Sequence, residues 1–259
     1  GTSFMNPFSL QNEIALITGA SSGLGLATAH ALAQAGATVL LTARRENLLN
    51  DAVAAITAAG GKAHALVHDA ADLPSIPDLL PRAIKAAGTA PTILINNAGI
   101  NMKKPALDTS DEDFARIHLT NTAAAFALSR TFAKPMVEQK RGSILFIASM
   151  ASLFGIPGVV AYSSSKSATL GLVRTLAVEL SPHNVRVNAI APGWIETAMS
   201  KTAFANDPAR AEKILSRTPM HSLGSPQDIA LAAVYLSSPP ANFIPGTCLP
   251  IDGGISIGF

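Results

Sequence analysis

Short apolar runs alternate with longer alanine-rich stretches through nearly the whole chain, and this alternation most restricts the fold. In the first half, strands are expected at residues 14–17, 38–42, 63–68 and 92–95, and helices at residues 27–35, 47–59 and 79–87. Apolar strands separated by helical crossovers form a parallel sheet that is buried on both faces. Because such crossovers are right-handed, helices cover both faces, and the sequence predicts a doubly wound α/β fold.

The second half continues the pattern without a low-complexity linker or an internal repeat. A long helix is expected at residues 111–137, a strand at 144–148, a helix from about residue 160, and strands at 185–190 and 247–251. We therefore expect one domain, residues 13–259, after an N-terminal segment of residues 1–12. Residues 1–4 could be an expression scar, with Met5 as the natural start.

A glycine-rich turn joins the first expected strand to the first expected helix. It reads T-G-A-S-S-G-L-G from Thr18 to Gly25. Glycines permit a tight turn, and the free amides and dipole at a helix start favour a pyrophosphate. In this strand-turn-helix context the turn predicts a dinucleotide site in a Rossmann-type sheet. Its expected contacts are Gly19, Ser21, Ser22, Gly23, Leu24 and Gly25.

The end of the second expected strand indicates which dinucleotide binds. An acidic side chain here would bind the ribose 2′-hydroxyl of NAD, but the chain has Arg44 and Arg45. A guanidinium is suited to a 2′-phosphate, so NADP(H) is favoured over NAD(H). The alternative is that both arginines belong to a solvated loop.

Two other motifs suggest hydrolytic enzymes. Residues 19–23 also read G-x-S-x-G, the nucleophile elbow of α/β-hydrolases, but an elbow follows several earlier strands and this turn follows the first. Ser163 and Lys166 form S-x-x-K, although neither S-D-N nor K-T-G follows. Both readings are therefore disfavoured.

Ser149, Tyr162 and Lys166 have the spacing of a proton-transfer site. Tyr162 and Lys166 are four residues apart, so on a helix they lie one turn apart on one face. A nearby ammonium favours the phenolate, which lets a tyrosine act as general acid and base. Ser149 follows the strand expected at 144–148 and so faces the ligand crevice. Taken alone, a tyrosine and a lysine at this spacing are more often a half-buried ring beside a lysine whose amine reaches the solvent. The other motifs must therefore decide whether this pair is catalytic.

Composition argues against several other classes of protein. The net charge is +2, and no run of lysine or arginine exceeds a pair, which makes nucleic acid and membrane surfaces unlikely partners. Cys248 is the only cysteine, which excludes an intrachain disulfide and fits a reducing cytoplasm. No apolar run could span a membrane and no signal peptide opens the chain. The six histidines have no metal-ligand spacing and are expected to be structural or on the surface.

Taken together, the motifs resemble the short-chain dehydrogenase/reductase family. They are T-G-x-x-x-G-x-G at residues 18–25, N-N-A-G at 96–99, Ser149, Y-x-x-x-K at 162–166, and Pro192-Gly193 followed by Thr197. The resemblance extends from about Phe8 to Gly254. It implies an oxidoreductase that acts on CH-OH donors with NAD(P) as acceptor.

The family also implies roles for individual residues. Tyr162 would exchange a proton with the substrate oxygen, Ser149 would hydrogen-bond to that oxygen, and Lys166 would bind the nicotinamide ribose and lower the Tyr162 pKa. Asn121 matches the asparagine that supports a proton-relay water, although Thr122 stands where the family has an apolar residue. The other implied cofactor contacts are Asp69, Ala70, Asn97, Ala98, Gly99, Pro192, Gly193, Ile195 and Thr197.

The substrate is harder to infer from sequence. In this family it is bound mainly by a lid, here residues 194–219, and by the loop between Ser149 and Tyr162. The chain most resembles the gluconate 5-dehydrogenase group, in residues 148–155, 242–246 and 252–255. Lys103 and Lys104 fall where that group is also basic and could meet a sugar-acid carboxylate, or could simply be solvated.

Two alternatives stay open. A 3-oxoacyl-thioester reductase shares every catalytic motif, and a catalytically silent NADP-sensing regulator shares the fold, although such regulators usually lose the tyrosine or the lysine. The resemblance further implies a homotetramer, with the helices around Asn121 and Tyr162 and the closing strand between subunits.

Overall fold

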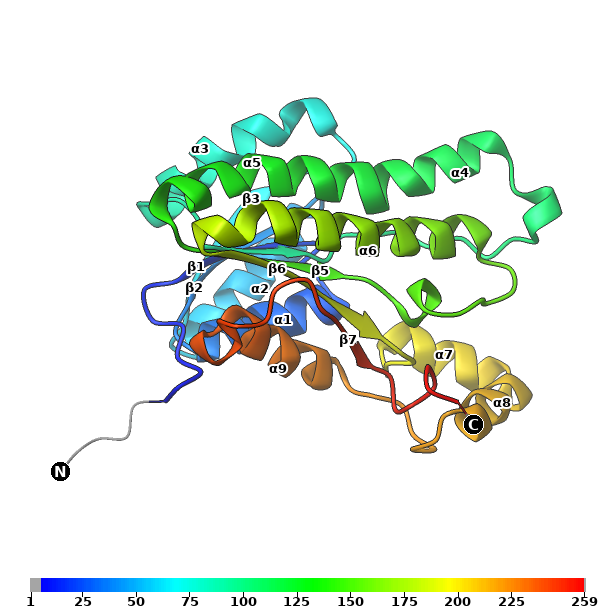
Figure 1. The fold of residues 1–259 in the computed structure, drawn as a ribbon. Coiled ribbons are helices and arrows are strands. Elements are labelled where there is room, and N and C mark those ends of the chain that lie inside the picture. Colours follow the sequence, from blue (N-terminus) through cyan, green and yellow to red (C-terminus); the bar gives the residue numbers. More distant parts are fainter. Residues whose placement is uncertain (1–5, 259) are drawn as a thin grey trace.

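The computed structural model describes residues 6–258, apart from the side chains of residues 199 and 203, and its centre is a seven-stranded parallel sheet (Figure 1). The strands are β1 (Ile14–Thr18), β2 (Thr38–Ala43), β3 (Lys62–Val67), β4 (Ile93–Asn96), β5 (Gly142–Ile147), β6 (Val185–Pro192) and β7 (Cys248–Ile251). Their order is β3-β2-β1-β4-β5-β6-β7, which confirms the predicted doubly wound sheet. Because the order reverses between β1 and β4, a crevice opens at their carboxyl ends. The suspected scar, residues 1–4, lies outside the described residues.

Helices cover both faces of the sheet, as Figure 1 shows. One face carries α1 (Gly23–Gln34), α2 (Glu46–Ala58) and α9 (Pro226–Ser237), and the other carries α3 (Ile76–Ala87), α5 (Ala124–Gln139) and α6 (Val160–Leu180). None of the helices among residues 6–258 combines the length and apolar character that a membrane span requires.

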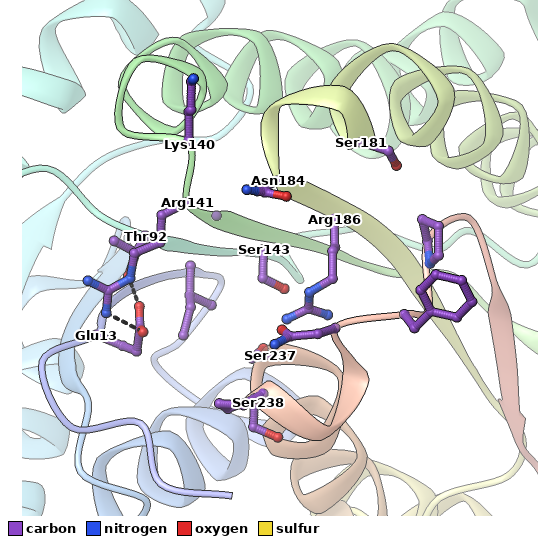
Figure 2. Close-up of a pocket in the computed structure, with 16 residues that line it drawn as sticks. Glu13, Thr92, Lys140, Arg141, Ser143, Ser181, Asn184, Arg186, Ser237 and Ser238 are labelled. Atoms are coloured by element: carbon purple, nitrogen blue, oxygen red, sulfur yellow. Dashed lines mark hydrogen bonds and ion pairs between the residues drawn. The ribbon is translucent and has the colours of Figure 1, made fainter.

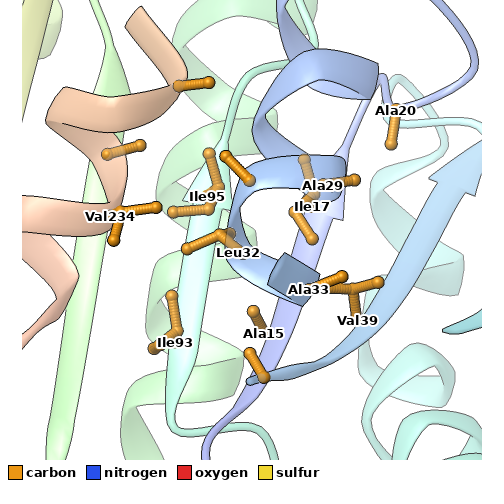
Figure 3. Packing of buried hydrophobic residues seen from close by; sticks show 14 of the residues in the cluster. Ala15, Ile17, Ala20, Ala29, Leu32, Ala33, Val39, Ile93, Ile95 and Val234 are labelled. Atoms are coloured by element: carbon orange, nitrogen blue, oxygen red, sulfur yellow. The ribbon is translucent and has the colours of Figure 1, made fainter. Parts of the chain in front are cut away.

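Alternate residues of each strand enter different halves of the core. Ala15 and Ile17 of β1 pack with α1 and α9, whereas Leu16 packs on the opposite face. In Figure 3, Ile17 and Ile95 lie close to Leu32 of α1, and Val234 of α9 approaches from the side. This period-two sorting explains why the strands read as continuous apolar runs in sequence.

The long helix expected at residues 111–137 is not continuous, and this expectation is wrong in that respect. It consists of α4 (Asp111–His118), a π-helical turn (Leu119–Ala123) and α5. The wide turn contains Asn121, whose side chain leaves the helix to hydrogen-bond with the backbone of Ile100. Turns of this kind are frequent at functional sites.

Three further helices follow β6, and none of them was expected individually. The predicted lid region contains α7 (Ala198–Asn206) and α8 (Pro208–Arg217), and α9 begins nearby. Ser225 and Asp228 form a reciprocal capping box at the start of α9, with Pro226 in the first turn. This S-P-x-D pattern is a recognisable helix start signal.

Candidate active site

Two adjoining cavities lie along the carboxyl edge of the sheet. One has a volume of about 550 Å³ and contains Ser149, Tyr162 and Lys166. The other has a volume of about 540 Å³ and contains the glycine-rich turn and Arg44. Asn97, Gly99 and Ile100 line both cavities, so the two form one groove across the crevice between β1 and β4.

Two elements bring the predicted proton-transfer residues together. Ser149 follows β5 in an extended conformation, and its Oγ accepts a hydrogen bond of 3.1 Å from the Ala151 amide. Tyr162 and Lys166 lie in the first turns of α6, with Nζ 5.9 Å from the centre of the phenol ring. Lys166 is buried, and its Nζ donates a 2.7 Å hydrogen bond to the carbonyl oxygen of Ile147. A lysine held in this way has two further N–H groups to offer.

The pKa of Tyr162 departs from the expectation. Burial raises it above the usual value for a phenol, and hydrogen bonding with Ser149 opposes that shift only in part. The expected lowering of this pKa by Lys166 is therefore not found, because burial of the ring dominates. The phenol is protonated at neutral pH and is a proton donor in this state.

Burial also changes the ammonium beside it. It lowers the pKa of Lys166 to about 8. At pH 7 the side chain is mostly charged, and any anion or hydroxyl that binds nearby would help to retain that charge.

Asn121 holds the backbone of Ile100, a residue of the groove wall, through hydrogen bonds. Its Oδ1 accepts a 2.8 Å hydrogen bond from the Ile100 amide, and its Nδ2 donates 2.9 Å and 3.0 Å bonds to the Ile100 carbonyl and the Ser165 hydroxyl. The side chain is buried and does not line either cavity. It fixes the loop that follows β4 and lies close to Gly99, opposite Lys166.

The glycine-rich turn fits a phosphate group. Ser22 precedes α1 but forms no side-chain cap, and the first turn of α1 has no acidic residue, so the helix start is available to an anion. Gly19 has a φ of +63°, in the region that favours glycine. Any Cβ at Gly25 would collide with the Gly19 carbonyl and the Asn97 amide, which keeps α1 close to the turn.

The remaining predicted cofactor residues fall into two groups. Those that line the groove are Gly19, Ser21, Ser22, Leu24, Arg44, Arg45, Asp69, Ala70, Asn97, Ala98, Gly99, Tyr162, Lys166, Pro192, Gly193, Ile195 and Thr197. Gly23 and Gly25 do not line it, and shape the turn instead. The Thr197 hydroxyl also caps α7 by accepting a hydrogen bond from Ser200.

Gly99 leaves the wall of the groove open between Asn121 and Lys166. A Cβ there would lie 3.2 Å from Asn121 Oδ1 and 3.3 Å from Lys166 Nζ. An alanine would therefore crowd the wall between these two polar atoms. The bare backbone, the uncapped helix start and the exposed Arg44 together fit an NADP(H)-sized dinucleotide along the groove.

His68 was missed as a groove residue by sequence reasoning. It is buried, lines the Arg44 side of the groove, and hydrogen-bonds through Nε2 to Ser75 Oγ at 3.1 Å. Burial is the main reason why its pKa lies below the usual value. The signal for it was its place just before Asp69 at the end of β3.

Lys103 and Lys104 have different environments. Lys104 forms an ion pair with Asp113, with 3.0 Å between Nζ and Oδ2, and its amide bonds to the Gly158 carbonyl. Lys103 lines the cavity that contains Tyr162. Of the two lysines suggested by sequence, only Lys103 faces the site.

A third cavity, of about 900 Å³, lies at the opposite edge of the sheet (Figure 2). Both of its arginines have structural partners: Arg141 pairs with Glu13, and Arg186 donates to the Leu236 carbonyl near the end of α9. Helix ends that point carbonyls into this edge account for the cations there. Among residues 6–258, no three histidine, cysteine or acidic side chains are grouped as metal ligands.

Comparison with known proteins identifies the family. Residues 19–256 match the family model described as enoyl-(acyl carrier protein) reductase. The chain is 35% identical over 250 residues to gluconate 5-dehydrogenase of Gluconobacter oxydans, covering 96% of this chain and 97% of that protein. It is 33% identical over 249 residues to 3-oxoacyl-[acyl-carrier-protein] reductase FabG of Thermotoga maritima, covering 96% and 99%.

A solved structure has the same architecture. The gluconate 5-dehydrogenase of Burkholderia cenocepacia, in complex with NADP and tartrate, superposes with a TM-score of 0.92 and 28% identity over 98% of both chains. The sheet order, the groove and these relatives agree with the resemblance found in the sequence. The chain belongs to the short-chain dehydrogenase/reductase family, whose dehydrogenases act on CH-OH groups with NAD(P) as acceptor.

Proposed function

We propose that the protein is an NADP(H)-dependent dehydrogenase that interconverts a secondary alcohol and a ketone on a sugar acid or related polyol, of the gluconate and 5-keto-gluconate type. The observation that carries this proposal is one cavity that contains Ser149, Tyr162, Lys166 and Lys103 and no acidic side chain. The Gluconobacter relative and the Burkholderia complex with NADP and tartrate support it.

Each side chain has a role that its surroundings allow. In reduction, Tyr162 donates its proton to the carbonyl oxygen, and in oxidation it takes the proton back. Ser149 already accepts from Ala151, so its own hydroxyl hydrogen is available to the same oxygen. Lys166 holds its charge near the phenol and offers its remaining N–H groups to ribose hydroxyls, while Asn121 keeps the adjoining loop in place. NADP(H), when bound, supplies or accepts the hydride.

The cofactor is proposed to lie with its pyrophosphate at the start of α1. Arg44 and Arg45 are both exposed, line the groove and form no ion pair with a described carboxylate, which suits them to a 2′-phosphate. Asp69 and Ala70 lie on the same side, where the adenine would bind.

A 3-oxoacyl-thioester reductase is the second candidate. A further cavity of about 690 Å³ adjoins the site and is lined by Phe154, Ile214 and Ile257, which could receive an apolar chain. The Thermotoga relative supports this reading. Because Tyr162 and Lys166 are both present, a silent regulator is the weaker alternative.

We also propose a homotetramer. Phe114 and Leu119 on or beside α4, Phe126 on α5 and Val160 on α6 are each more than a third exposed. A row of large apolar side chains on neighbouring helices is typical of a surface that another subunit covers.

Initial-rate spectrophotometry tests the proposed reaction. The substrates are 5-keto-gluconate and acetoacetyl thioester with NADPH or NADH, and gluconate with NADP in reverse. Turnover of the keto acid with NADPH is expected. Reduction of the thioester alone would favour the second candidate, and NADPH binding without turnover of either compound would favour the regulator.

A further inference from the structure

Besides Lys103 and Lys166, a third cation faces the reaction cavity from the lid. Arg210 lies on α8 and lines both the cavity that contains Tyr162 and the adjoining 690 Å³ cavity, as Lys103 and Trp194 also do. No acidic side chain lines either cavity. Arg210 and Lys103 therefore lie at the junction of these cavities, on elements far apart in sequence.

Neither cation is neutralised by the described part of the chain. The ion pairs found there involve Asp113, Glu13 and Glu196, and none includes Lys103 or Arg210. Asp207, three residues before Arg210, caps α8 by accepting a 3.0 Å hydrogen bond from the Arg210 amide, and Glu212, two residues after it, is in none of these ion pairs. The Asp207 carboxylate is committed to the helix start and not to the guanidinium.

The position of Arg210 is fixed by the helix that carries it. Pro208 and the Asp207 cap define the start of α8, and the buried Ile214 anchors it one turn later. Arg210 itself is half-buried, whereas Lys213 on the same helix is exposed and lines only the outer cavity. A partly desolvated guanidinium without a carboxylate gains more from an anionic ligand than a solvated one does.

We propose that Arg210, together with Lys103, forms a two-sided clamp for the carboxylate of the substrate, and that Arg210 is the residue that makes the site selective for acids over neutral polyols. This inference rests on the proposed function, because it concerns the substrate of the same site. A guanidinium can bind a carboxylate through two parallel hydrogen bonds, while Lys103 adds a point charge from the loop after β4.

Trp194 provides a direct test. It is the only tryptophan of the chain and lines both cavities beside Arg210, so its fluorescence reports a ligand in the site without turnover. Gluconate and its uncharged counterpart glucitol are titrated into the NADPH-saturated protein, in which the reduced cofactor cannot oxidise either alcohol. The variants are Arg210→Gln, Arg210→Lys and, as matched control, Lys213→Gln.

Loss of a charge-assisted pair should weaken gluconate binding by about 10- to 100-fold in Arg210→Gln. Arg210→Lys should recover part of the affinity, Lys213→Gln should bind gluconate like the wild type, and no variant should alter the weak binding of glucitol. Unchanged gluconate affinity in Arg210→Gln, or equal losses for gluconate and glucitol, would overturn the clamp.

Turnover separates this proposal from the one on which it rests. Reduction of 5-keto-gluconate is compared with reduction of L-sorbose, which has CH₂OH in place of the carboxylate. Arg210→Gln should raise KM for the acid and leave that for sorbose unchanged. If Arg210→Gln reduces the keto acid with an unaltered KM, the clamp is refuted and the proposed function stands. If gluconate binding depends on Arg210 but the keto acid is not reduced, the clamp stands and the proposed function is refuted.

Discussion

Tyr162 is subject to two opposing influences in its cavity. Burial makes the phenolate costly, while hydrogen bonding with Ser149 offers it partial compensation. In the cofactor-free protein burial dominates, so the ring holds its proton. A residue of this kind is prepared to donate in reduction and needs a further positive charge nearby before it can serve as a base.

Replacing Tyr162 with Phe tests its proposed role. Removal of a general acid typically lowers a rate about 10²- to 10⁴-fold. The reduction rate of the variant should therefore be lower than that of the wild type by at least about 10²-fold. NADPH binding should be nearly unchanged, because the phenol oxygen is only one contact along the groove. Steady-state rates and NADPH fluorescence titration measure the two effects.

The same variant reports on the phenol's pKa. The chain has two tyrosines, so ultraviolet titration of the cofactor-free protein should contain a phenol that ionises above its ordinary pKa and that is absent from Tyr162→Phe. Addition of NADP, which brings a positively charged nicotinamide, should shift that ionisation to lower pH. Wild-type turnover in the variant would exclude Tyr162 as the proton donor.

At the scale of elements, the loop between β2 and α2 carries the proposed choice of cofactor. Arg45 is the residue before α2, and Arg44 lies next to it at the end of β2. Both are exposed at the groove, and the first turn of α2 contains Glu46. The loop therefore offers two guanidinium groups to a phosphate. Substitutions in this loop can change the cofactor preference without altering β2 or α2, which flank it.

Exchange of Arg44 for Asp should shift the preference from NADP(H) toward NAD(H). A carboxylate repels a 2′-phosphate and accepts a hydrogen bond from a 2′-hydroxyl, so the ratio of kcat/KM for the two cofactors should change by about 10- to 100-fold. Arg82→Gln is a suitable control, because Arg82 bonds to the Val67 carbonyl and does not line the groove. An unchanged cofactor ratio in Arg44→Asp would mean that the phosphate is held elsewhere.

Sequence patterns predicted the sheet because the apolar runs of β1, β2, β4 and β5 are buried on both faces and leave little ambiguity. The π-helical turn at Leu119–Ala123 was not predictable from periodicity. It depends on the hydrogen bonds between Asn121 and Ile100, a contact between segments 21 residues apart. The α9 helix was not predicted, although the Ser225 capping box at its start can be recognised in the sequence.

The site was predictable to the extent that short motifs encode it. Ser149, Tyr162 and Lys166 meet in one cavity because strand and helix ends meet at one edge of a parallel sheet. Arg210 was missed because nothing in its local sequence marks it, and His68 was missed although it directly precedes Asp69 after β3. Their places follow from how α8 and the end of β3 fold against the groove.

At the scale of the whole molecule, neighbouring helices expose apolar side chains on one side: Phe114, Leu119, Phe126, Val160 and Val178 lie on α4, the π-helical turn, α5 and α6. Phe126 is exposed on α5, with the Arg130 guanidinium 5.2 Å from its ring centre. Several such side chains on adjacent helices would be unfavourable in water, and a partner subunit would cover them.

We expect light scattering to give a mass about four times the 26.6 kDa of one chain, and Phe126→Glu to give smaller species. A buried, unpaired carboxylate at the interface opposes association. Ile84→Glu is the matched control, because Ile84 of α3 is 38% exposed and Phe126 is 37% exposed, but α3 lies outside the proposed interface. A monomeric wild type, or dissociation by both variants alike, would contradict the proposal.

The groove is assembled from two separate parts of the chain. The turn after β1, the loop after β2 and the end of β3 form the side on which adenosine and phosphate are proposed to lie, while residues from β5 to α8 form most of the other side. Changes at Arg44 and at Arg210 share no contact partner, so their free energies should add. Substitutions could therefore change the substrate specificity of the enzyme without changing its cofactor preference. The two properties could evolve independently of each other.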